Sequence, residues 1–485
     1  MERLFYPLIF IFLCLLSGVG YCQPSDAVYA SSQTNDNPHG GISSANVDNP
    51  QNAITNTISN TSDASFKKPN TKFTTLKATA SSIATGNAAA WIQLAFVSTP
   101  TDVAVPANTT VYIKATTAAA GLLGLVGGGG LTFTAYSSNT GNNNPVTLAA
   151  TPKVYYTADG NIYFAVKPTA NFKSIRITLT AGAVLGDGSV DIFYAFYGPN
   201  QANDSNPFPS NIADCGLPNV TSTAFSGITI GSVSIANPGN SIDTDVNTAS
   251  AYNTAGASVA GHIIQTFHFN GNSNSGDAVR VIFSKGSNLV NVDVGKAVTI
   301  QGYNGGTAVG KSKLLNSLLD VDLLGLLTSS STAVTSYFAP KDDNNAPVIF
   351  DRVTLDFDLG LLGISLNGNG LNVFDVRRVP DVPSASDVTA CTNVGTINLA
   401  ATTAQTTITG IGNFTYTWYN AVRQGTLLST LVGQLPYVVT GLTTVGKKDY
   451  YVDITKSGCT VPSGRTKVTV NTVNPPVTPP VALVP

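Results

Sequence analysis

Oxygen-bearing side chains crowd one short stretch of this chain. Asp243 and Asp245 are separated by one residue, and Asn240 and Thr248 flank them. Calcium is bound by hard oxygen ligands of this kind, so one interpretation of the stretch is a calcium site. Calcium is also the only cofactor that the residues suggest. The alternative is an Asx-rich turn in which the same side chains cap their own backbone. The residues leave both interpretations open.

Asp356 and Asp358 form a second group with chemical potential. Two carboxylates at this spacing on a strand share one face, and paired carboxylates catalyse glycoside hydrolysis. However, Val353, Leu355 and Phe357 alternate with them as candidates for a core. We therefore expect both acids to lie on the solvent side of a sheet, as charged residues on strands usually do.

The remaining candidates for chemistry are isolated in the sequence. His262 and His268 have no cysteine or carboxylate cluster close to them along the chain, which argues against a metal or nucleophile site. Trp91 is of the type that stacks on sugar rings, but it precedes an alternating apolar strand, and this favours packing in the core. We predict no catalytic residue and no enzymatic activity.

The chain contains a long internal repeat. The stretch from Val47 to Ile54 resembles that from Ile235 to Ile242, a shift of 188 residues (235 − 47 = 188). Further landmarks recur in the same order: Ile92-Gln93-Leu94 with Ile264-Gln265-Thr266, Tyr163-Phe164-Ala165 with Tyr337-Phe338-Ala339, and Arg176-Ile177-Thr178-Leu179 with Arg352-Val353-Thr354-Leu355. A long period with ordered landmarks indicates two copies of one domain rather than a solenoid.

The local pattern predicts β-strands throughout. Apolar and polar residues alternate, as in Arg352 to Asp358, and Asn304-Gly305 is typical of a tight hairpin turn. Amphipathic helical runs of useful length are absent from the sequence. Many short strands with frequent turn residues indicate an all-β chain with two tandem jelly-roll-like β-sandwiches.

Composition limits the partners. The 485 residues suit about three domains. Charged residues make up only 11% and the net charge is −2, so the sequence offers no basic stripe for nucleic acid. After the N-terminus, no apolar segment is long enough to span a bilayer. These features favour an extracellular β-protein over a nucleic-acid-binding or membrane-spanning one.

The N-terminus predicts export. Arg3 precedes an apolar stretch, and Gly20 and Cys22 suit a cleavage site after residue 22; lipidation of Cys22 is the alternative. The predicted division is a signal peptide (1–22), a disordered leader (23–42), a first sandwich (43–199), a linker (200–213), a second sandwich (214–380), a third unit (385–473) and a proline-rich tail (474–485).

The third unit carries an ordered set of motifs. Cys391 is followed by Tyr416-Thr417-Trp418-Tyr419, Tyr450-Tyr451-Val452 and Gly458-Cys459. This order resembles the bacterial Ig-like modules of proteins secreted by type IX-secreting gram-negative bacteria. The resemblance implies an Ig-like β-sandwich with a Cys391–Cys459 disulfide packed against Trp418. Cys215 would then be left over, either buried or cross-linked to another molecule.

The oxygen-rich stretch of the second repeat resembles the opening motif of discoidin-like, galactose-binding-like sandwiches, which often wraps a calcium ion. Thr244 stands where that motif usually has glycine, and the first repeat lacks both acids. The resemblance implies carbohydrate binding.

We therefore expect a non-catalytic protein, secreted or on the outer surface of a gram-negative bacterium, with a structural or adhesive role. The alternative function is carbohydrate binding by the discoidin-like repeats. The expected partner is an extracellular glycan or a surface protein, and self-association is a further interpretation.

Overall fold

The computed structural model describes most of the chain. The described residues are 28–38, 43–55, 72–79, 88–96, 103–117, 130–181, 188–197, 216–229, 232–255, 258–269, 271–286, 296–318, 332–360, 369–403 and 414–476. The predicted signal peptide, the predicted linker and most of the predicted tail lie outside them.

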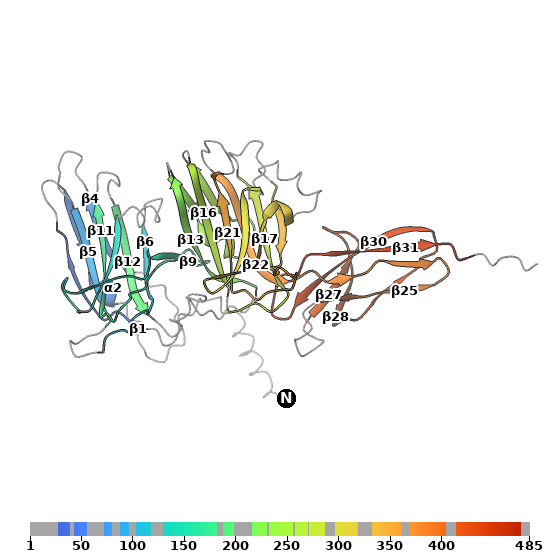
Figure 1. Cartoon of the computed structure of the whole chain (residues 1–485), viewed down its shortest axis with the longest axis horizontal. Coiled ribbons are helices and arrows are strands. Elements are labelled where there is room, and N and C mark those ends of the chain that lie inside the picture. The colour runs from blue at the N-terminus through green and yellow to red at the C-terminus, as the bar shows by residue number, and fades with distance from the viewer. Residues whose placement is uncertain are drawn as a thin grey trace, which may run out of the picture.

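The described chain is almost entirely β-structure, as predicted. Figure 1 shows three β-sandwiches in a row along the longest axis of the molecule. The helices among the described residues are single short turns: α2 (Asn52–Thr55), η2 (Pro238–Ile242) and η4 (Leu315–Leu318). Within the same residues, no helix has the length and apolar character that crossing a bilayer requires.

The first repeat packs two sheets against each other. One sheet contains, in spatial order, β9 (Lys153–Tyr156), β10 (Ile162–Val166), β6 (Val111–Thr117), β12 (Gly188–Tyr197), β4 (Thr74–Thr79) and β3 (Ser44–Asp48), with β1 (Val28–Tyr29) beside β12. The other contains β2 (Ser32–Asp36), β5 (Ala88–Ala95), β11 (Ser174–Ala181), β7 (Leu131–Tyr136) and β8 (Pro145–Val146). Alternate residues of the second sheet, such as Ile92 and Ile177, face the first sheet and form part of one buried core.

The second repeat has the same strand order, which confirms the repeat. One sheet of this repeat contains, in spatial order, β13 (Pro218–Thr229), β16 (Ser258–Phe269), β21 (Arg352–Asp358), β18 (Val298–Asn304) and β19 (Thr307–Leu314). This order matches β2-β5-β11-β7-β8 of the first repeat. The other sheet runs β14 (Ser232–Ala236), β15 (Ser250–Ala255), β22 (Asn369–Pro380), β17 (Asp277–Lys285) and β20 (Val334–Phe338), matching β3-β4-β12-β6-β10.

One landmark of the repeat is shifted in the structure. Arg176 lies opposite Gln93 on β5, and Arg352 lies opposite His268 on β16. Gln93 therefore corresponds to His268 and not to Gln265, which lies in the buried interior of the second repeat. The sequence match is displaced by three residues (268 − 265 = 3), and an odd displacement along a strand exchanges its two faces.

The two repeats are joined by one continuous sheet. Strand β9 of the first repeat pairs with β13 of the second, with Tyr155 opposite Ser222 and Tyr156 opposite Thr221. The result is a twelve-stranded sheet that runs through both repeats. The ring of His268 also packs against Tyr155, at 5.3 Å between ring centres. Backbone hydrogen bonds thus fix the repeats to each other more rigidly than a flexible linker would.

The predicted disordered leader is wrong for residues 28–36. Strand β1 pairs with β12, and β2 pairs with β5 at the edge of its sheet. The side chains of β2 are polar and half-exposed or exposed. These residues show no strand pattern, because an edge strand is held by main-chain hydrogen bonds and does not need apolar side chains.

The third unit is a smaller sandwich. Its main sheet runs β24 (Val388–Cys391), β31 (Thr466–Val473), β30 (Gly446–Lys456), β27 (Phe414–Tyr419) and β28 (Leu427–Val432). Two further pairs are β25 (Thr396–Leu399) with β29 (Tyr437–Thr440), and β23 (Ser384–Ala385) with β26 (Ala401–Thr402). Trp418 is fully buried at its centre and stacks on Tyr437, at 5.4 Å between ring centres.

The third unit docks closely on the second repeat. The Arg377 guanidinium donates a hydrogen bond from Nη1 to the hydroxyl of Thr460 at 3.0 Å. Gly464 faces Tyr337 so closely that an added Cβ would lie 3.2 Å from the tyrosine ring. The pKa of Tyr337 is raised, first by burial and also by the nearby Asp453 carboxylate.

A substitution at Gly239 tests how tightly the two repeats are packed against each other. A Cβ added at Gly239 would lie 2.3 Å from the backbone oxygen of Thr157 in the first repeat. We expect Gly239→Ala to lower the free energy of unfolding by about 1–3 kcal/mol, the usual range for overpacking. Gly306→Ala is the control, because nothing lies within 4 Å of its added Cβ. Equal urea-unfolding curves for the two variants would show that the junction is not tight.

Asp453 provides a pH test of the third unit. Burial raises its pKa from 3.8 to about 6, although Arg465 opposes the rise. The folded state therefore holds this proton more tightly than the unfolded state, and the penalty for burying the carboxylate is relieved as the pH falls through about 6.

As the pH falls from about 7.5 to about 4.5, protonation of Asp453 should raise the free energy of unfolding by about 2 kcal/mol. Asp453→Asn lacks the titrating group, so wild type should gain that stability relative to the variant as the pH falls. Urea unfolding at both pH values measures the difference. A difference that does not depend on pH would contradict the assignment.

Candidate functional site

The oxygen-rich stretch of the second repeat forms a turn that caps itself. The backbone N–H of Asp245 donates to Asp243 Oδ1 at 2.9 Å, and the Thr248 hydroxyl donates to Asp243 Oδ2 at 2.7 Å. Asn240 lies in the preceding η2 turn, where its N–H bonds to the carbonyl of Asn237. Within the described part of the chain, no three His, Cys, Asp or Glu residues gather as a metal site. Calcium binding by Asn240, Asp243, Asp245 and Thr248 stays a prediction.

Asp356 and Asp358 point away from the core and are half-buried, as predicted. His262 Nδ1 lies 2.9 Å from Asp356 Oδ1, a contact that its neighbours along the chain did not indicate, because the two residues are 94 positions apart. Ser226 lies opposite His262 on β13, so a serine, a histidine and an aspartate follow one another across three strands. A nucleophile must contact its base, however, and no hydrogen bond joins Ser226 to His262 among the described residues.

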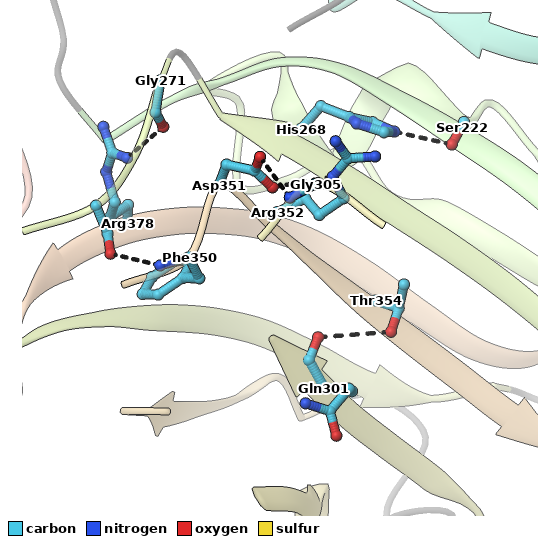
Figure 2. A network of polar contacts seen from close by, with 11 residues as sticks. Ser222, His268, Gly271, Gln301, Gly305, Phe350, Asp351, Arg352, Thr354 and Arg378 are labelled. Carbon is cyan, nitrogen blue, oxygen red and sulfur yellow. Dashed lines mark hydrogen bonds and ion pairs between the residues drawn. The ribbon is translucent and has the colours of Figure 1, made fainter. Parts of the chain in front are cut away.

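His268 belongs to a polar network at the junction of the repeats. Figure 2 shows its ring directed at Ser222, with Arg352 and Asp351 beside it. His268 Nε2 lies 3.0 Å from the Ser222 hydroxyl, and Arg352 Nε lies 3.0 Å from Asp351 Oδ1. Burial, and secondarily the charge of Arg352, lower the pKa of His268 well below 6.5, so the ring stays neutral.

This network does not form a catalytic triad. A triad places a carboxylate at the second ring nitrogen of its histidine. His268 Nδ1 has no hydrogen-bond partner in the described chain, and Asp351 pairs with Arg352 instead. The arrangement secures the strand junction, since Ser222 lies on β13 next to β9.

The predicted Cys391–Cys459 disulfide is wrong. Cys391 is a free thiol, whereas Cys459 is disulfide-bonded to a cysteine outside the described residues. Cys391 lies opposite Val473, at the end of the sheet where β30 begins, and Cys459 follows the other end of β30. The length of β30 separates these ends by roughly 30 Å, at about 3.3 Å per residue, far beyond disulfide reach. Trp418 accordingly packs on Tyr437 and not on a disulfide.

We expect peptide mapping without reduction to find Cys391 free and Cys459 joined to Cys215. Cys215 itself lies outside the described residues. Its neighbour Gly216 accepts a hydrogen bond from the backbone N–H of Arg378 at 2.8 Å, and Arg378 lines the same small pocket as Cys459. This pairing would replace the expectation that Cys215 is left over. A linked peptide that contains Cys391 and Cys459 would refute it, and a reduced digest is the control.

Trp91 lies on the outer face of the β2-β5-β11-β7-β8 sheet, which corrects its expected place in the core. Its neighbours Ala90 and Ile92 are the residues of β5 that enter the core. Trp91 itself is half-buried. The sequence pattern misled because β5 carries apolar residues on both faces, so alternation did not distinguish them.

Arg176 stacks on Trp91. Its guanidinium carbon lies 3.8 Å from the centre of the Trp91 ring system and 5.0 Å from that of Tyr136. Nε and Nη2 of Arg176 both donate to Gln93 Oε1, at 3.2 Å and 2.8 Å. We call Trp91, Gln93, Tyr136 and Arg176 the arginine cluster. Sequence reasoning missed it because Arg176 is 83 residues from Gln93, and only strand pairing brings them together.

The arginine cluster has the chemistry of a binding surface. It offers a half-exposed aromatic ring beside a fixed cation. The attraction between a cation and an aromatic face contributes about 0.5–2 kcal/mol. The outer face of this sheet is therefore the best candidate for a functional site in the described chain.

Comparison with protein families and with curated proteins gives no match. Among solved structures, the chain is similar to a β-1,2-glucanase from Parabacteroides distasonis (TM-score 0.23, 11% identity, 54% of this chain and 38% of the other). It is also similar to the Epf adhesin domain from Streptococcus pyogenes (TM-score 0.18, 11% identity, 53% and 93%). A third similar structure is the CBM22 tandem domain from Paenibacillus barcinonensis (TM-score 0.17, 10% identity, 74% and 99%).

The chain spans about two fifths of the glucanase, as it does of the Endo-D glycoside hydrolase domain from Streptococcus pneumoniae R6, where it covers 38%. TM-scores this low define neither the family nor the function of the chain.

Proposed function

We propose that this chain is a non-catalytic extracellular protein with a structural or adhesive role, which presents its first sandwich at the end of a rigid row. The continuous sheet through β9 and β13 carries this proposal. A sheet shared between domains resists bending, and so do the close contacts of the third unit with the second repeat. A row of this kind holds a terminal domain away from the surface to which the other end is attached.

The half-exposed ring of Trp91 favours a more specific role, carbohydrate binding. Arg176 lies over one face of the Trp91 ring, and the opposite face has the flat apolar surface on which a sugar ring packs. The proposed binding surface lies on the first repeat, whereas the discoidin-like resemblance concerned a loop of the second. The outward position of Trp91 is thus the observation that favours a glycan as partner.

A panel of immobilised bacterial and plant polysaccharides tests both parts of the proposal. We expect the full chain to be retained by at least one polysaccharide and to release no reducing ends from any. Trp91→Ala should weaken retention about tenfold or more, because stacking on an aromatic ring accounts for about 1–3 kcal/mol in comparable contacts. Tyr419→Ala in the third unit is the control. Release of reducing ends would refute the non-catalytic role, and full retention of Trp91→Ala would refute this binding surface.

A further inference from the structure

We propose that the arginine cluster binds an acidic glycan, with Arg176 pairing with a sugar carboxylate while the adjoining sugar ring packs on Trp91. This proposal rests on the carbohydrate-binding role above and adds the chemical class of the ligand. It is argued from the contacts of Arg176, from its counterpart in the second repeat and from the residues that surround it.

Most of the described arginines pair with an aspartate, whereas Arg176 and the exposed Arg423 do not. Five arginines each lie within 3.9 Å of an aspartate carboxylate: Arg280, Arg352, Arg377, Arg378 and Arg465. Arg176 is also partly buried, yet it has no carboxylate partner among the described residues and donates to the neutral oxygen of Gln93. Burying a cation without a counter-ion is unfavourable, so an anionic ligand would stabilise this arrangement.

The guanidinium is held in a fixed position. Gln93 is fully buried, and its amide donates to the Ser174 hydroxyl at 2.7 Å. That hydroxyl donates in turn to the carbonyl of Ser138 at 2.7 Å. The amide oxygen of Gln93 therefore faces Arg176, while Nη1 of Arg176 makes no hydrogen bond within the described chain. A planar guanidinium with unused donors is suited to paired hydrogen bonds with a carboxylate.

The second repeat provides an internal comparison. Arg352 corresponds to Arg176, but it is preceded by Asp351, whose carboxylate neutralises it. In the first repeat Ile175 stands at the position of Asp351 and points into the core. The first repeat thus keeps the arginine and lacks the acid, and a carboxylate from a ligand would restore the pair.

The surroundings favour a sugar over a protein. Trp91 lies opposite Thr178, which in turn lies opposite Thr132, and Arg176 lies opposite Thr134. Protein interfaces have an apolar, water-free centre, which a row of threonines does not supply. On its other side Trp91 lies opposite Asp36 of β2, so we expect the carboxylate of the ligand on the Arg176 side of the ring. The other side chains around the ring carry hydroxyl and amide groups, which match the hydroxyl groups and the apolar ring face of a saccharide.

The test uses polygalacturonate and the same polymer after its carboxylates are reduced to hydroxymethyl groups. Affinity electrophoresis or calorimetry with the full chain measures binding to both. We expect the acidic polymer to bind at least about tenfold more tightly than the reduced polymer, and we expect added salt to weaken the binding of the acidic polymer. Arg176→Gln should weaken binding of the acidic polymer about tenfold, and Arg176→Lys should weaken it less, because lysine keeps the charge without the planar donors.

Lys77→Gln is the matched control. It removes one positive charge from the other sheet of the first repeat, where Lys77 pairs with Asp48. Its binding should stay within about twofold of wild type, since the charge is exposed and away from the cluster. Thermal melting of each variant shows whether it is folded. If Arg176→Gln does not fold, the binding of Arg176→Lys tests the proposal instead.

The outcomes separate the two proposals. Equal binding of the acidic and reduced polymers would overturn the acidic specificity and leave carbohydrate binding intact. Binding of neither polymer, together with no retention on the polysaccharide panel, would overturn both. Full binding by folded Arg176→Gln and Arg176→Lys would place the site elsewhere. Equally tight binding of poly-glutamate would indicate an acidic peptide as the partner and overturn the glycan.

Discussion

The backbone pairing of β9 with β13 determines the architecture of this protein. Without it, the two repeats would be separate sandwiches on a linker of uncertain geometry. With it, one sheet of the first repeat continues into the opposite sheet of the second. Because main-chain hydrogen bonds set both the distance and the direction of neighbouring strands, the pairing also fixes how the repeats face each other. The position of every surface on the first repeat relative to the rest of the chain follows from it.

The same pairing explains why equivalent residues have different roles in the two repeats. At the junction, Ser222 pairs with His268, Arg352 pairs with Asp351, and the ring of His268 packs on Tyr155 of the first repeat. Arg176 occupies the place of Arg352 in the first repeat, where no preceding repeat covers the sheet among the described residues. The same face of the domain therefore lies at the junction in the second repeat and away from it in the first.

Charge is scarce in this chain, and one group of buried ion pairs lies beside the contact of the second repeat with the third unit. Asp375 lies between Arg280 and Arg377, and Arg377 reaches Thr460 of the third unit. Buried ion pairs contribute little net stability, but removing one partner is costly, so they favour one docking geometry over others.

The sequence by itself determined the features that depend on local alternation and on order along the chain. The strand around Arg176 and the strand around Arg352 each show a period of two, and their shared landmarks predicted the repeat. The all-β class and the outward position of Asp356 and Asp358 followed in the same way.

Tertiary structure alone decided the features that depend on which strands pair and in which register. These are the outward face of Trp91, the contact of His262 with Asp356, the bonding of Cys459 and the strands at 28–36. A polar edge strand such as β2 has no apolar signal, and a strand apolar on both sides such as β5 has an ambiguous one. Contacts between residues far apart in the chain form only when the sheets assemble, and local patterns do not encode their partners.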